Sequence, residues 1–453
     1  MRLAWSRFAW VLAAITLVGL TLRVGYVVAV AWDAPLKGDQ VYYNAQANRL
    51  AQGHGFVEPF DVDLNVRRTG TGPSAEHPPL TAIVLAPVSW VTDRLPWVDV
   101  DTRRGDVHAP AHRLTLAIIG SLSVVMIGLL GREVRGERAG LIAAGIAALY
   151  PNLWVNDGLV MAESLTVIAV VWALYLVYRY RRAPRVRTTV LLGVAAGLAA
   201  LARAEMILLV PFLVVPALLG TGASWPVRWR RAAIGVVAAG IVVGPWALFN
   251  LTRFEDPTFL STNDGQTLLG ANCDPAYHGR AAGLWHLSCL PDVPGDRSEV
   301  STEYKRRASD YIGDHLDRVP SVVAIRVGRL WNVYRPADMV WYNEGEGRER
   351  WVSRLGLWSF YPLMALATAG AFMLRRSWGR LWPLLAPMAI VTGVAALSYG
   401  QARFRAPAEP GIVVLAAVAV VGFARGRRRG PTGEAGKAEP DRNPAFDQPE
   451  PAA

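Results

Sequence analysis

The chain has 453 residues, of which 52% are hydrophobic and only 18% are charged, and its formal net charge is +11. Soluble domains carry about 25% charged residues, so this composition argues against a soluble protein. On a soluble protein such a positive charge would indicate a nucleic-acid partner. Here the arginines cluster in short loops between long apolar runs, a pattern that sets the orientation of membrane proteins, and we expect no nucleic-acid partner.

Ten apolar runs are long enough, or nearly so, to cross about 30 Å of hydrocarbon as helices. They cover residues 8–31, 111–131, 139–155, 161–178, 189–202, 206–220, 232–250, 354–374, 381–399 and 409–424. The first run is too long for a signal-peptide core and is predicted to stay as a span. Because backbone groups inside hydrocarbon must be paired within their own segment, the sequence predicts an all-α polytopic membrane protein with a bundle of about ten helices.

The basic loops predict which side of the membrane each loop faces. Arginines cluster after the second, fourth, sixth, eighth and tenth runs, and basic loops stay in the cytoplasm. With ten spans and a cytoplasmic N-terminus, all of these loops and the C-terminus lie inside the cell. A further span at Leu80–Val91 would move every later basic loop outside, so this short apolar run is predicted to be an interfacial or re-entrant helix.

This topology leaves two long outer loops, residues 32–110 and 251–353. The second loop contains both cysteines, Cys273 and Cys289, and disulfides persist outside the cytoplasm. We expect the two cysteines to be bonded; two free thiols are the alternative.

The predicted domain organisation is simple. Residues 1–425 are expected to form one transmembrane domain that includes both outer loops. Residues 426–453 are rich in Pro, Gly and acidic side chains with few large apolar ones, which predicts a disordered cytoplasmic tail.

The first outer loop opens with a predicted amphipathic helix at the surface. Tyr42, Tyr43, Ala47 and Leu50 recur at helical spacing. Asp39 lies just before them, so it can cap the first turn of this helix or take part in chemistry, and the two roles can coexist.

A histidine precedes the short apolar run of the same loop. Pro78 and Pro79 end one element and start the next, and His77 comes directly before them. His77 is therefore either a loop histidine near the interface or a group that contacts substrate or orients Asp39.

Two polar positions lie at the ends of spans. Glu163 begins a span, and a carboxylate at membrane depth is costly unless it faces a cavity or a partner, so it is a candidate site residue. Asp157, in the preceding hairpin, could equally be solvated. Arg203 lies between two apolar runs, where it either forms an interfacial ion pair with Glu205 or points into a cavity.

The short outer loop between the last two spans contains Arg403 and Arg405, which break the rule that arginines stay inside. Paired guanidinium groups typically bind phosphate, so this exception predicts an anionic ligand. The sequence has no nucleotide-binding loop, no zinc-type spacing of Cys and His, and no nucleophile elbow.

Seven motifs follow one another on the outer side of the predicted membrane. They are Gly38-Asp39 with Tyr42-Tyr43, His77-Pro78-Pro79-Leu80, the hairpin from Tyr150-Pro151 to Glu163, Leu201-Ala202-Arg203, Pro245-Trp246, Ser261-Thr262-Asn263, and Arg403-Phe404-Arg405 with Ala406-Pro407-Ala408-Glu409-Pro410. Together they resemble the polyprenyl-phosphate-sugar-dependent glycosyltransferases of the GT-C superfamily. The pattern is similar to the protein O-mannosyltransferase and aminoarabinose-transferase branches, glycosyltransferase family 39.

The resemblance implies a GT-C-like helical bundle in the cell envelope, with its active site on the extracytoplasmic face. It implies an inverting transfer of a hexose or pentose from a polyprenyl phosphate to a hydroxyl group of a glycan, lipid or protein. The alternatives are a lipid or solute transporter and a non-catalytic membrane protein of envelope assembly.

The resemblance also assigns roles to the candidate residues. Asp39 is expected to act as the general base, and the phosphate is expected to bind Arg403, Arg405 and Arg203. The residues expected to contact substrate are His77, Glu163, Tyr42, Tyr43 and Asn263. A carboxylate base with arginines needs no metal, although Glu163 and His77 leave room for a divalent ion.

Overall fold

The structure is a computed structural model that describes residues 6–59, 61–63, 66–68, 72–95 and 107–428. These residues are predominantly helical, and their strands form one short antiparallel hairpin, β1 (Asp61–Asp63) with β2 (Val66–Arg68). The all-α class is therefore confirmed. Most of the predicted tail, residues 429–453, lies outside the described residues.

Within the described residues, seven helices are long and apolar enough to cross a membrane singly. They are α1 (Arg7–Tyr26) with the π-helical turn η1 (Val27–Ala31), α4 (Ala109–Arg135), α7 (Glu163–Arg182), α10 (Trp225–Arg253), α16 (Arg350–Leu374), α17 (Trp378–Leu397), and α18 (Glu409–Arg428) preceded by the 3₁₀ helix η6 (Ala402–Ala408). The prediction of a polytopic membrane protein is thus confirmed.

The other predicted runs are also helical, but they are bent or short. One pair of helices is apolar enough only when taken together and is bent by 61°, so it is either a broken span or a re-entrant loop: α5 (Glu137–Leu149), followed by α6 (Pro151–Trp154) and η2 (Val155–Gly158). Proline at the bend fits the first turn of a helix but cannot continue the preceding one. Shorter apolar helices are α3 (Leu80–Thr92), α8 (Val186–Ala202), and the segment of η3 (Ala204–Leu208), η4 (Val210–Val214) and α9 (Val215–Leu219).

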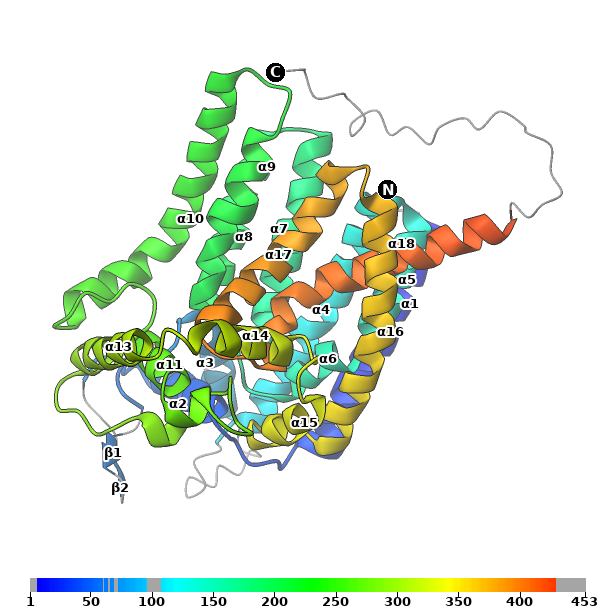
Figure 1. The fold of residues 1–453 in the computed structure, drawn as a ribbon. Helices are drawn as coiled ribbons and strands as arrows, with labels where there is room; N and C mark the ends of the chain where they lie inside the picture. The colour runs from blue at the N-terminus through cyan, green and yellow to red at the C-terminus, as the bar shows by residue number, and fades with distance from the viewer. Residues whose placement is uncertain (1–5, 60, 64–65, 69–71, 96–106, 429–453) are drawn as a thin grey trace.

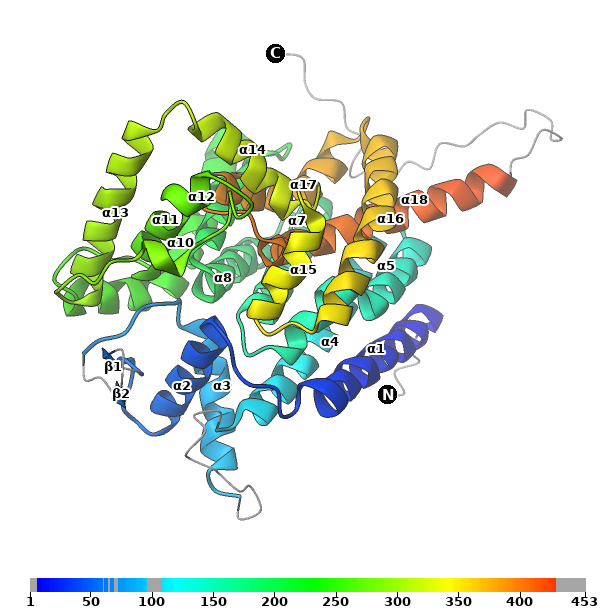
Figure 2. The same cartoon turned by 60° about the horizontal axis from the view of Figure 1, so that its bottom comes forward.

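The remaining helices gather at one end of the bundle (Figures 1 and 2). They are α2 (Asp39–Ala51), α11 (Asn263–Ala271), α12 (Asp274–Tyr277), η5 (Leu287–Cys289), α13 (Arg297–Asp314), α14 (Val319–Leu330) and α15 (Pro336–Gly345). The helix predicted around Tyr42 is thus present as α2. Its Tyr42, Tyr43 and Ala47 face inward and are buried against the bundle end.

The basic loops meet at the opposite end of the bundle. Glu133, near the end of α4, lies 3.1 Å from Arg182 at the end of α7. The hydroxyl of Tyr178 donates to the backbone carbonyl of Arg380 at the start of α17, 2.5 Å away. Because α7 starts at Glu163 and ends at Arg182, about 30 Å of helix separate the two ends.

Helix α18 is the centre of the bundle, and this explains how η6 is held. Residues 405–419 are all buried, whereas α1 and α10 expose apolar side chains such as Leu17 and Ile241 to their surroundings. The turn into η6 requires Gly400, since a Cβ there would lie 2.1 Å from the carbonyl oxygen of Arg326 in α14. The Gly400 N–H also donates to the carbonyl of Gly283 at 2.8 Å. These contacts fix η6 beneath the outer helices.

Candidate active site

An ion pair between the first outer loop and the last one forms the centre of the site. Asp39 is the first residue of α2, and its Oδ2 lies 2.8 Å from Nη2 of Arg403 in η6. The N-cap position of α2 is occupied by Gly38, with φ of 56°, so the carboxylate of Asp39 is not the cap. Of the two roles considered for Asp39, capping of the helix is therefore excluded, and a part in the chemistry of the site remains.

Arg403 is buried among three carboxylates. Besides Asp39, its Nη1 lies 3.1 Å from Oε2 of Glu346 and 4.0 Å from Oε1 of Glu163. Its Nε donates to Oε1 of Gln401 at 3.0 Å. The Arg403 side chain is only 6% exposed, so the guanidinium plane is held on several sides and cannot swing freely.

Glu163 links Arg403 to a second arginine. Its Oε1 accepts a hydrogen bond from Nη1 of Arg203 at 3.1 Å, and the Glu163 side chain is 2% exposed. Nε of Arg203 also donates to Glu205 at 2.6 Å. The predicted Arg203–Glu205 pair exists, but it extends inward and places Arg203 in the same cluster as Arg403. A buried carboxylate with cationic partners is what a position at membrane depth requires.

Aromatic rings form one wall beside Asp39. The ring of His77 stacks on Tyr43 at 4.9 Å and meets the edge of Tyr42 at 5.1 Å. Nε2 of His77 lies 3.7 Å from Oδ1 of Asp39 and has no hydrogen-bond partner among the described residues. The hydroxyl of Tyr42 is bonded to Ser74 at 2.9 Å. The wall therefore presents one free imidazole nitrogen toward the carboxylate.

The surrounding charges keep Asp39 ionised. Burial raises the pKa of the Asp39 carboxyl, but the Arg403 guanidinium, helped by His77 and Arg203, outweighs this effect and holds that pKa at about 2. For Glu346, burial dominates and raises the pKa, with Arg403 opposing the shift and Asp39 adding to it. Two carboxylates that share one guanidinium are thus shifted in opposite directions.

Arg405 lies apart from this cluster. Its Nε donates to Oε1 of Glu409 at 2.7 Å, the two side chains are 1% and 2% exposed, and its guanidinium lies 3.8 Å from the ring centre of Phe360. The structure thus brings together Asp39, His77, Tyr42, Tyr43, Glu163, Arg203 and Arg403, and it does not bring Arg405 to them.

Asn263 and the two cysteines support the outer helices. Asn263 begins α11, and the N–H of the preceding Thr262 donates to the carbonyl of Ala75 at 2.8 Å. The start of α11 therefore contacts the loop segment that leads to His77. Oδ1 of Asn263 is buried without a partner among the described residues. Cys273 and Cys289 are joined by a disulfide bond with an S–S distance of 2.02 Å.

Two site residues were missed in the sequence. Glu346 and Arg348 lie in the short loop between α15 and α16, where several acids and arginines alternate without a motif. The loop is held over α2 because Gln40 donates to the carbonyl of Glu346 at 3.1 Å.

Asp157 is not solvated, which was one of the alternatives for this residue. It is buried and pairs with Arg23 of α1 at 2.7 Å.

The carboxylates fit a guanidinium better than a metal ion. Coordination of a divalent cation needs several oxygens directed at one point. Among the described residues, no group of three or more His, Cys, Asp or Glu side chains is arranged to hold a metal. The point on which Asp39 and Glu346 converge is taken by Arg403.

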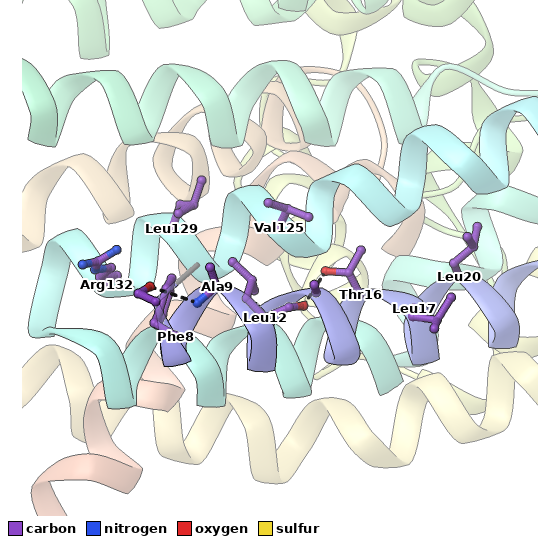
Figure 3. A pocket seen from close by; sticks show the side chains of 11 residues that line it. Phe8, Ala9, Leu12, Thr16, Leu17, Leu20, Val125, Leu129 and Arg132 are labelled. Atoms are coloured by element: carbon purple, nitrogen blue, oxygen red, sulfur yellow. Dashed lines mark hydrogen bonds between the residues drawn. The ribbon is translucent and has the colours of Figure 1, made fainter. Parts of the chain in front are cut away.

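A cavity of about 520 Å³ lies elsewhere, along α1 and α4 (Figure 3). Apolar side chains such as Leu12, Leu20 and Val125 line it, and Arg132 lies at one end. The cavity lies between two candidate membrane spans, and none of the cluster around Arg403 contributes to it.

Comparison with known proteins finds similarity to one protein family over part of the chain. A family model described as dolichyl-phosphate-mannose-protein mannosyltransferase matches residues 104–249, the part of the chain that includes Glu163 and Arg203. No curated protein matches the chain.

Solved structures of an archaeal oligosaccharyltransferase show the same fold. The oligosaccharyltransferase of Archaeoglobus fulgidus in its apo form is similar with a TM-score of 0.56 and 14% identity, over 93% of this chain and 51% of that one. Its complex with an inhibitory peptide and a dolichol-phosphate is similar with a TM-score of 0.54 and 15% identity, over 94% of this chain and 52% of that one. A lower TM-score of 0.43, with 15% identity, is found for the protein O-mannosyltransferase Pmt1-Pmt2 complex of S. cerevisiae bound to the sugar donor. This match covers 61% of this chain and 36% of that one.

This chain therefore spans about half the length of the archaeal enzyme chain that it matches. The archaeal similarity over nearly the whole of this chain shows that it shares the fold of that oligosaccharyltransferase over the matched part, as the resemblance in the sequence led us to expect.

Proposed function

We propose that the chain is an inverting glycosyltransferase that moves a sugar from a polyprenyl phosphate to a hydroxyl acceptor. The observation that carries this proposal is the contact between Asp39 and Arg403, a candidate base and a candidate phosphate ligand in one buried cluster at the end of the bundle. The proposal is supported by the fold that this chain shares with the archaeal oligosaccharyltransferase, which has been captured with a dolichol-phosphate.

The proposed step is a single displacement. The acceptor oxygen attacks the anomeric carbon of the sugar while Asp39 takes the proton of the acceptor hydroxyl. The bond between the anomeric carbon and the phosphate oxygen breaks, and its electron pair leaves with the polyprenyl phosphate. Attack opposite the leaving group inverts the anomeric carbon. Proton transfer by a positioned side chain contributes about 10²–10⁴-fold to the rate.

The leaving phosphate needs fixed positive charge. Arg403 lies beside Asp39, and Arg203 reaches the same cluster through Glu163, so both can stabilise the developing negative charge. Arg405 is already neutralised by Glu409, and we assign it to holding η6 in place. The wall of Tyr42, Tyr43 and His77 offers ring surfaces on which a sugar can pack.

The location of the Arg403 cluster supports an acceptor that approaches from outside the cell. The cluster lies at the end of the bundle away from the basic loops, which we assign to the cytoplasm, so the site faces the outside and the outer leaflet. A hydroxyl of a glycan, lipid or protein could reach Asp39 there, whose side chain is 32% exposed.

Purified protein in lipid nanodiscs is the system for testing this function. A panel of polyprenyl-phosphate mannose, arabinose and other sugars would be supplied with hydroxyl acceptors, and release of polyprenyl phosphate would be measured. We expect release with at least one donor and a loss of at least about 10²-fold for Asp39→Asn. Asp33→Asn, an exposed position ahead of α2, is the matched control and should keep the wild-type rate. Normal transfer by a folded Asp39→Asn variant would exclude this mechanism.

A further inference from the structure

The arginines around the site differ in what neutralises their charge. Arg403 pairs with Asp39 and Glu346, Arg203 with Glu163 and Glu205, and Arg405 with Glu409. Arg348 is the exception. Within the part of the chain that the structure describes, its guanidinium forms no ion pair within 4.0 Å, and its one polar contact is a hydrogen bond of 2.7 Å from Nη2 to Oδ1 of Asn156, a neutral group.

Arg348 is nevertheless buried. Its relative exposure is 5%, and burial lowers the pKa of its guanidinium. Arginine stays protonated in proteins, so the charge itself persists. Burying a charge without a counter-ion is unfavourable, and natural sites usually supply an opposite charge. Here the nearby acids, Glu163 and Glu346, are already engaged by Arg203 and Arg403.

The position of Arg348 relates it to the proposed phosphate site. It lies two positions after Glu346, which contacts Arg403, and Glu163 and Arg403 are among the charges that act on it. Asn156 fixes its orientation, since the Asn156 side-chain amide also donates to the carbonyl of Asn152 at 2.9 Å. The other guanidinium N–H groups of Arg348 have no protein acceptor among the described residues.

We infer that Arg348 is a second ligand of the lipid phosphate, acting with Arg403 on the donor and on the polyprenyl phosphate that leaves. This inference rests on the proposed function and adds a residue that its motifs do not include. The phosphate supplies the counter-ion that Arg348 lacks, and a guanidinium fork suits phosphate oxygens. The sequence predicts Arg405 as a phosphate ligand, but Glu409 already neutralises the charge of Arg405. We therefore assign the role of second phosphate ligand to Arg348.

Binding of the product tests the inference without any catalysis. Thermal unfolding of the full chain in nanodiscs would be followed with polyprenyl phosphate, with uncharged polyprenol and with inorganic phosphate. We expect polyprenyl phosphate to raise the Tm of the wild type, with little effect of the other two. Arg348→Gln should weaken this binding about 10–100-fold, the effect of one hydrogen-bonded charge. Arg350→Gln, two positions on and in an exposed pair with Glu344, should bind as the wild type does.

Each outcome of this experiment supports or overturns the role of Arg348 as a phosphate ligand. Wild-type affinity of Arg348→Gln for polyprenyl phosphate would overturn the inference, as would an equal response to inorganic phosphate or polyprenol. If Arg348 only supported the loop, Arg348→Gln would lower the Tm of the ligand-free protein and keep the full ligand shift. Arg348→Lys keeps the charge and should restore part of the binding, which covers the case in which the Gln variant does not fold.

The inference and the proposed function fail separately. Loss of sugar transfer in Asp39→Asn, together with unchanged product binding by Arg348→Gln, would reject only the role of Arg348. Binding of polyprenyl phosphate through Arg348 by a chain that transfers no sugar from any donor would reject only the proposed function.

Discussion

The carboxylate of Asp39 and the guanidinium of Arg403 are 2.8 Å apart in space and 364 positions apart in the sequence. This contact gives Arg403 two tasks in the proposed reaction. It holds the base, and it is also the cation nearest to the leaving phosphate. When a phosphate binds Arg403, part of its charge is neutralised, so the pKa of Asp39 should rise and its carboxylate should become a stronger base.

Replacing Arg403 by Gln should therefore change both the rate and its dependence on pH. We expect kcat/KM to fall by about 10²–10³-fold, because a cation at the leaving oxygen is lost. In the wild type the pKa of Asp39, at about 2, lies far below the working range, so Asp39 stays ionised. Without Arg403 the effect of burial remains and raises that pKa, so the residual activity should fall as the pH is lowered from about 7 to about 5.

Steady-state kinetics across this pH range are the measurement for Arg403→Gln. The control is Arg306→Gln, which removes an arginine from an exposed pair on α13 and should leave the profile unchanged. An Arg403→Gln variant with a flat profile and wild-type kcat/KM would show that Arg403 neither holds Asp39 nor meets the phosphate.

The pair of Arg405 and Glu409 should matter for stability and not for donor binding. Both side chains are almost fully buried, so Arg405→Met would leave the charge of Glu409 without a partner, at a cost of about 3–5 kcal/mol. Replacing both residues by Met should recover much of this loss, since no lone charge remains. Thermal unfolding in detergent, with donor KM for the folded fraction, would measure both effects.

A different result would assign Arg405 a different role. An Arg405→Met variant with wild-type Tm and a raised donor KM would return Arg405 to the phosphate site. Arg306→Ala, from an exposed pair with Glu303, is the comparison for stability and should change the Tm little.

The disulfide between Cys273 and Cys289 should stabilise the outer helices. The sequence separation is 16, and closing a loop of this size typically contributes about 3 kcal/mol. The loop includes Gly283, whose carbonyl accepts the N–H of Gly400 just before η6. Replacing both cysteines by Ser should lower the Tm and reduce kcat less than Arg403→Gln does.

Reductant provides the matching control for the disulfide. It should lower the Tm of the wild type to that of the double Ser variant and leave that variant unchanged. Wild-type Tm in the double Ser variant would mean that the bond contributes nothing to stability.

The sidedness of the site can be measured directly. The chain has no cysteine beyond the bonded pair, so the double Ser variant can carry single reporters. His54→Cys lies after α2 and Pro184→Cys lies in the basic loop after α7, and both positions are exposed. On intact cells, a membrane-impermeant maleimide should label the first reporter and not the second. The reverse labelling would place the cluster in the cytoplasm and end the proposed function.

The sequence by itself determined the helical spans, the short helix α3, the helix α2 and most of the chemically important residues. These features are local, because a hydrophobic run of sufficient length must pair its backbone as a helix, whatever surrounds it. The clustering of arginines is local as well, and it separated the basic end of the bundle from the end that contains Asp39 and Arg403.

Only the tertiary structure decided which of these residues meet. Arg403 and Arg405 are two positions apart and look alike in sequence, yet one reaches Asp39 and the other is enclosed with Glu409. The difference arises from the packing of η6 beneath α14 at Gly400 and against buried α18. Glu346 and Arg348 enter the site for the same reason: the loop that contains them is placed by long-range contacts such as that of Gln40, which no local pattern encodes.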